Sequence, residues 1–141
     1  MNELGNLRIR GVLILTMLGW TATAALLLLT LLFDYQNELV PVAFSAALTI
    51  IPTYYAMKER YDPAAGIVLG IMAAIQPALL VYMLQGHAWQ MEGHMYFFVG
   101  LAALTLVCDW KPIGVAVAAI AVHHILLSYL APEWVFIGSG D

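Results

Sequence analysis

Four histidines are the residues best suited to chemistry in a chain that otherwise has few polar side chains. His87 and His94 bracket a short link, whereas His123 and His124 stand side by side in a later apolar run. A neutral imidazole binds copper, zinc, nickel or haem iron, and the nearby thioether of Met91 favours copper. Imidazoles left unpaired in hydrocarbon would be costly buried polar groups. We therefore predict a metal or haem site among these side chains.

The principal ligands in this prediction are His94 and His124, because both fall near the same end of neighbouring helices. His123 is a third candidate for a cofactor, and His87 or Met91 is a third candidate for a metal ion. Adjacent helical residues point about 100° apart, so only one of His123 and His124 aims squarely at a given site. Copper and haem b are the favoured cofactors. The alternative, in which the histidines only pack and form hydrogen bonds, stays open.

The elements that must position these histidines are membrane helices. Hydrophobic residues make up 63% of the 141 residues and charged residues 10%, against about 45–50% and about 25% in soluble domains. A membrane-spanning helix needs about 20 apolar residues. Charged residues divide the chain into five apolar runs, which predict transmembrane helices at roughly 11–33, 38–57, 63–86, 92–110 and 112–130. The predicted fold class is all-α, a single bundle of five antiparallel helices over 1–141.

The positive charges predict the orientation of this bundle. All of them fall before the first run or in the links after the second and fourth runs, namely Arg8, Arg10, Lys58, Arg60 and Lys111. The positive-inside rule then places the amino terminus in the cytoplasm and the tail from Pro132 on the periplasmic side of a bacterial inner membrane. Five scattered basic residues form no patch able to neutralise a phosphate backbone, which excludes nucleic acid as a partner.

Small and polar residues inside the runs suggest how the helices meet. Gly66 and Gly70 form a GxxxG pair that lets another helix approach closely. A similar stripe of small residues on the last run comprises Gly114, Ala118 and Ala121. Gln76 lies mid-membrane beside Pro77, where it either hydrogen bonds a neighbouring helix or lines a ligand cavity. Pro77 also leaves the Ala73 carbonyl without its helical partner.

No pattern of a catalytic site is present. The sequence lacks a Ser/His/Asp grouping, paired carboxylates and a phosphate-binding loop, so we predict that the protein is not an enzyme. A small membrane redox protein that binds haem or copper is one alternative. A small transporter or channel is another, although only Gln76 among midplane residues is polar enough to favour it.

Three short elements between Gly86 and Phe136 carry a family resemblance: His-Met-Tyr-Phe-Phe at 94–98, Cys-Asp-Trp at 108–110 and His-His at 123–124. With these elements in this order, the chain resembles the amino-terminal membrane domain of a group of bacterial methyl-accepting chemotaxis proteins. The resemblance implies a sensory or transducer module that forms a homodimer or higher oligomer. It also implies a sixth helix leading to a cytoplasmic signalling domain. Because this chain stops at Asp141, we expect it to give no signalling output alone.

Overall fold

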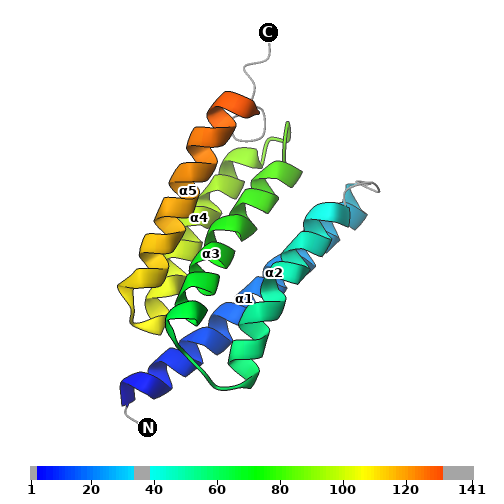
Figure 1. Cartoon of the computed structure of the whole chain (residues 1–141). Helices are drawn as coiled ribbons and strands as arrows, with labels where there is room; N and C mark the ends of the chain where they lie inside the picture. The colour runs from blue at the N-terminus through cyan, green and yellow to red at the C-terminus, as the bar shows by residue number, and fades with distance from the viewer. Residues whose placement is uncertain (1–2, 34–38, 132–141) are drawn as a thin grey trace.

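The computed structural model describes residues 3–33 and 39–131, which form five α-helices and one turn of 3-10 helix (Figure 1). In chain order these are α1 (Glu3–Leu32), α2 (Leu39–Met57), α3 (Pro63–Met83), α4 (Gln90–Leu104), η1 (Thr105–Val107) and α5 (Trp110–Leu130). The predicted all-α bundle of five helices is therefore confirmed. The link at 34–38 and the tail from Pro132 lie outside the described residues.

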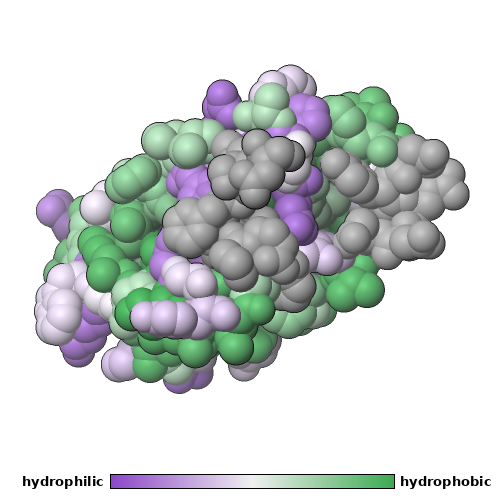
Figure 2. Space-filling model, turned by 90° about the horizontal axis from the view of Figure 1, so that it is seen from above, coloured by the Kyte–Doolittle hydropathy of each residue, from purple (hydrophilic) through white to green (hydrophobic). Residues whose placement is uncertain are grey.

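Four of the helices, α1, α2, α3 and α5, are long and apolar enough to cross a membrane. Their outer faces carry large exposed side chains such as Val40 and Leu130, which are 76% and 77% exposed. Figure 2, which looks onto the end where α5 finishes, shows hydrophobic residues around much of the rim. Length and composition thus indicate a multi-pass membrane protein.

The fourth predicted span, 92–110, is shorter in the structure than expected. Helix α4 has 15 residues and continues only through the three residues of η1. At ~1.5 Å per α-helical and ~2.0 Å per 3-10 residue, the two together measure about 28 Å. This is close to the thickness of the hydrocarbon core, about 30 Å. Helix α4 alone therefore falls short of a full crossing.

The ends of the other helices differ modestly from the predicted ones. Helix α1 begins at Glu3 rather than at 11, so it includes both arginines of the amino-terminal segment. Helix α3 ends at Met83 rather than at 86. Helix α5 begins at Trp110 because the Asp109 side chain accepts a hydrogen bond from the Lys111 N–H. Pro112 then falls in the first turn, where its missing N–H removes no helical hydrogen bond.

Helix α3 is the central element and packs against the four other helices. The predicted close approach at the GxxxG pair is confirmed, since a Cβ atom on Gly70 would lie 2.5 Å from the Pro112 carbonyl oxygen of α5. The stripe on α5 does not act in this way, because Gly114 is exposed and a Cβ atom there would meet only Trp110. In Figure 1 the α1–α2 pair leans away from α3–α5 towards the end where α5 finishes.

The end of the bundle that carries the basic residues is joined by polar contacts between three segments. Arg8 of α1 donates to the Cys108 carbonyl at 3.3 Å and lies over the Tyr61 ring at 5.3 Å. The Tyr61 hydroxyl donates to Asp109 Oδ2 at 2.8 Å. Arg60 forms an ion pair with Asp62, the N-cap of α3, at 2.6 Å. The amino-terminal helix and two interhelical links are thus fastened together at this end.

Candidate functional site

The structure gathers three of the four histidines around one phenylalanine. The ring centroids of His94 on α4 and His124 on α5 lie 6.3 Å apart. The buried Phe97 ring lies 6.2 Å from His94 and 5.5 Å from His124. His123 lies 5.3 Å from His124 and 6.2 Å from Phe97. We call these three histidines and Phe97 the histidine cluster.

Backbone hydrogen bonds orient the two principal imidazoles of this cluster. Nδ1 of His94 lies 3.0 Å from the Gln90 carbonyl oxygen, and Nδ1 of His124 lies 2.9 Å from that of Ile120. A carbonyl oxygen only accepts, so Nδ1 carries the proton on both rings and Nε2 keeps its lone pair. Metal-binding histidines are commonly held by such a bond from the other ring nitrogen. Two Nε2 atoms are therefore available as ligands.

The spacing of this pair suits a single metal ion. Imidazole nitrogens bind zinc at about 2.0–2.1 Å, which puts two ring centroids on one such ion roughly 5 to 6.5 Å apart, depending on the angle at the metal. The 6.3 Å separation of His94 and His124 lies at the upper end of this range, which corresponds to a nearly linear N–metal–N arrangement. Over residues 3–33 and 39–131, however, no three His, Cys, Asp or Glu side chains are grouped to hold a metal. The described residues thus offer a pair of ligands rather than a closed site.

Of the other two candidate ligands, His87 packs against other residues and Met91 is exposed. The His87 ring packs against Phe33 at 5.4 Å and Trp89 at 5.0 Å, and its Nδ1 accepts a hydrogen bond from the Trp89 N–H. Met91 is 55% exposed on the first turn of α4. The structure does not bring His87 into the cluster, so a third ligand from this side chain is not assembled.

Gln90 is a residue near the cluster that the sequence analysis missed. It is fully buried, and its Oε1 accepts a hydrogen bond from the Gly86 N–H at 3.2 Å. Its Nε2 has no hydrogen-bond partner among the described residues. Because residues four apart share one face of a helix, Gln90 lies on the face that carries His94. The four-residue spacing of Gln90 and His94 in the sequence could have indicated that they share this face.

A second group of polar residues lies buried between α1, α2 and α3. Ser45 donates to Gln76 Oε1 at 2.8 Å and lies 2.6 Å from the Thr23 hydroxyl. Gln76 Nε2 donates to Thr49 Oγ1 at 3.2 Å and to the Gly19 carbonyl at 3.4 Å. Ser45 has one proton, so Thr23 must donate to Ser45. We call Thr23, Ser45, Thr49 and Gln76 the hydroxyl network; it confirms that Gln76 hydrogen bonds neighbouring helices.

The threonines of α1 gave a signal that the sequence analysis did not use. Thr16, Thr23 and Thr30 recur every seven residues and are all buried, as expected for one face of a helix that packs on a partner. Thr16 and Thr30 also donate to a carbonyl four residues earlier in their own helix, and the Thr23 hydroxyl lies 3.0 Å from the equivalent carbonyl of Gly19. This spacing marks the face of α1 that meets α2 and α3.

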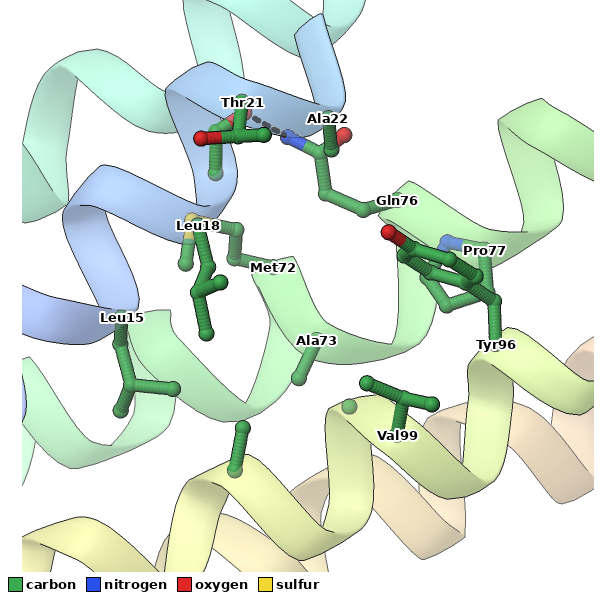
Figure 3. A pocket seen from close by; sticks show the side chains of 13 residues that line it. Leu15, Leu18, Thr21, Ala22, Met72, Ala73, Gln76, Pro77, Tyr96 and Val99 are labelled. Atoms are coloured by element: carbon green, nitrogen blue, oxygen red, sulfur yellow. Dashed lines mark hydrogen bonds between the residues drawn. The ribbon is translucent and has the colours of Figure 1, made fainter. Parts of the chain in front are cut away.

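Gln76 also lines a cavity between α1, α3 and α4 (Figure 3); that this cavity binds a ligand stays a prediction. The cavity measures about 80 Å³. Ala73 also lines the cavity, and Pro77 deprives its carbonyl of a helical partner. A Cβ atom on Gly100 of α4 would lie 2.9 Å from this oxygen. Because Gly100 has no side chain, α4 can pack closely against α3 at this carbonyl.

Comparison of the chain with protein-family models, with curated proteins and with solved structures finds no match in any of the three. The class that the fold itself defines is a multi-pass helical membrane protein. The resemblance to chemotaxis receptors stays a prediction.

Proposed function

We propose that this chain is the membrane-embedded sensory module of a chemotaxis-type receptor and that it binds a transition metal ion through His94 and His124. The observation that supports the metal site is the hydrogen-bond pattern that the two imidazoles share. Each Nδ1 is committed to a backbone carbonyl, and the rings lie 6.3 Å apart. Two Nε2 lone pairs are thus left for one ion.

Copper in its reduced state is the metal that suits a site with so few protein ligands. It accepts soft and imidazole ligands, and exposed Met91 is close in sequence. Haem b is less well supported. A porphyrin held between His94 and His124 would have to displace Phe97, which is only 6% exposed and contacts both imidazoles. A redox function for the same copper is the alternative that this site allows.

The sensory role rests on the position of the pair between two helices that both pack on α3. An ion that bridges α4 and α5 favours the packing in which the two imidazoles are closest. The basic residues lie at the opposite end of the bundle, so the positive-inside rule places the histidine cluster on the periplasmic side. Transmission to the cytoplasm would require the signalling domain and oligomer that the resemblance implies.

The metal site is tested on the full chain purified in detergent without added metal, then titrated with Cu(I). We expect about one copper per chain and a higher midpoint of thermal unfolding, because a ligand that binds only the folded state stabilises it. His94→Ala and His124→Ala should each lose both effects. His87→Ala is the matched control and should retain them. A Soret band in the purified protein would select haem instead.

If copper neither binds nor shifts the midpoint, and no Soret band is present, the histidine cluster is a packing feature. The sensory role needs a separate test. A fusion that joins this chain through a sixth helix to a chemotaxis signalling domain should respond to copper, and His124→Ala should abolish the response. Copper binding without a response in the fusion would contradict the sensory role and leave the metal site standing.

A further inference from the structure

The cavity between α1, α3 and α4 has an apolar wall made largely of small residues. Those that leave the space are Gly19, Ala22, Ala73, Gly100 and Ala103. On the side away from α3 it is bordered by Leu18 of α1 and Val99 of α4, which are 45% and 53% exposed. In a membrane these exposed side chains face lipid, so the cavity opens sideways into the hydrocarbon.

Its size limits what it can hold. At about 80 Å³ it is smaller than an engineered apolar cavity of about 150 Å³ that admits benzene. A chain of a few carbon atoms fits, and a longer tail can leave through the opening between α1 and α4. Among residues 3–33 and 39–131, no charged side chain lines the cavity, which disfavours an ionic ligand.

One polar group at this cavity lacks a partner. Tyr96 extends from α4 across Pro77, with its hydroxyl on the side of Gln76 (Figure 3). The hydroxyl forms no hydrogen bond with any residue between 3 and 33 or between 39 and 131. Tyr96 is 47% exposed, so in a membrane part of the ring would face lipid, where an unsatisfied hydroxyl is costly because no water is there to accept from it. This donor therefore indicates a ligand that brings an oxygen.

The amide of Gln76 lies at the back of the cavity and already donates from Nε2 to Gly19 and Thr49. Its two Nε2 hydrogen bonds, at 3.2 and 3.4 Å, are longer than the 2.8 Å bond that its Oε1 accepts. Hydrogen bonds of this length are weak. Gln76 therefore makes the back of the cavity polar, and the Tyr96 hydroxyl is the donor on which recognition of a ligand oxygen rests.

We propose that this cavity binds a small uncharged molecule that carries an alcohol or ketone oxygen on a short apolar chain. The molecule enters from the lipid between α1 and α4, and its oxygen accepts a hydrogen bond from the Tyr96 hydroxyl. Because the cavity wall combines α1 with α3 and α4, the bound molecule contacts both the α1–α2 pair and the α3–α5 group. This site is separate from the histidine cluster and does not depend on it.

Photolabelling of the full chain in lipid nanodiscs tests the proposal. The probe is 3-azibutanol, a diazirine analogue of butanol, and the labelled residues are located by mass spectrometry. We expect adducts on Met72 and Tyr96, with protection by 2-butanone but not by n-pentane at the same concentration in the membrane. Protection by the ketone alone would show that the oxygen is recognised.

Three variants make the test specific. Ala22→Leu fills the cavity and should reduce labelling about tenfold, as expected for loss of about 1.4 kcal/mol of binding free energy. Ala24→Leu adds the same side chain at an exposed position of α1 and should leave labelling unchanged. Tyr96→Phe removes only the hydroxyl and should reduce protection by 2-butanone about fivefold while the fold is retained.

Labelling that is unchanged in Ala22→Leu would overturn the site itself. Equal protection by n-pentane and 2-butanone, together with normal labelling of Tyr96→Phe, would show that the cavity accepts plain hydrocarbon such as a lipid chain, and would overturn the oxygen recognition. Gel-filtration elution and helical circular dichroism of each variant establish that it is folded. Because Tyr96→Phe keeps the shape of the side chain, it tests the proposal even if Ala22→Leu misfolds.

Discussion

The Tyr61 hydroxyl donates to Asp109 Oδ2 at 2.8 Å and so joins the α2–α3 link to the residue that caps α5. Burial raises the pKa of Tyr61 above its usual value, and the hydrogen bond to Asp109 raises it further. The Lys111 N–H lowers the pKa of Asp109, and the Tyr61 hydroxyl lowers it further. The pair is therefore held as a neutral phenol and a carboxylate.

The stability of the protein should fall at both extremes of pH through this pair. Asp109 has a lowered pKa in the folded state, so its contribution is complete above the unfolded pKa of about 4 and is lost as the pH falls. Tyr61 has a raised pKa, so its contribution is complete below about 10 and is lost as the pH rises. Thermal unfolding from pH 3 to 11 measures both limbs. Tyr61→Phe should flatten the alkaline limb; an equal change in Tyr54→Phe, whose ring is exposed, would contradict the assignment.

Gly70→Ala should destabilise the packing of α3 on α5. The added Cβ atom would lie 2.5 Å from the Pro112 carbonyl oxygen, and backbone on both sides leaves no flexible atom to move. Overpacking of this kind costs about 1–3 kcal/mol. Gly114→Ala is the matched control, because its Cβ atom would meet only the Trp110 ring at 3.6 Å. Equal midpoints of unfolding for the two variants in detergent would show that the close approach at Gly70 is absent.

Ser45→Ala should weaken the contact between α2 and α3. Ser45 donates to Gln76 and accepts from Thr23, so its loss removes a donor from the buried Gln76 Oε1, whereas the Thr23 hydroxyl can still donate to the Gly19 carbonyl at 3.0 Å. We expect a loss of about 1–2 kcal/mol in the free energy of unfolding. Thr21→Ala should cost less, because the Thr21 hydroxyl bonds only to the Met17 carbonyl of its own helix. The reverse order of stability would contradict the hydroxyl network.

Much of the fold was predictable because its signals are local. Runs of apolar residues locate the helices, the GxxxG pair at Gly66 and Gly70 predicts the tight contact of α3, and basic residues mark one end. The early start of α1 was missed, because a helix does not stop where hydrophobicity ends. The short α4 was missed since the 3-10 turn and the left-handed conformation of Cys108, φ 50°, leave no trace in hydropathy.

The candidate site was predictable in part for a different reason. His94 and His124 were paired from their depth alone, and the structure places their rings together. The position of His87 against Phe33 and Trp89 depends on how the α3–α4 link folds back, which residue spacing does not define. The partners of Gln76 come from two helices whose rotation about their own axes is decided by tertiary packing.

The distribution of positive charges predicts the orientation of the chain in the membrane. A reporter fused after Arg60 should be active only in the cytoplasm, and one fused after Asp141 only in the periplasm. Alkaline phosphatase and green fluorescent protein, used at each position, give opposite signals and control for expression. The reverse pattern at both positions would place the histidine cluster on the cytoplasmic side and remove the case for sensing from outside.

Opposite tautomers are expected for the two kinds of histidine in the metal-free protein. The backbone carbonyls of Gln90 and Ile120 accept from Nδ1 of His94 and His124, so both rings should carry their proton on Nδ1. Nδ1 of His87 instead accepts from the Trp89 N–H at 3.1 Å, so the neutral His87 ring should carry its proton on Nε2. Nitrogen-15 chemical shifts, assigned with single His→Ala variants above pH 8, distinguish the two forms. A proton on Nε2 of His94 or His124 would occupy the lone pair that the metal ion needs. The proposed ligand pair would then be wrong.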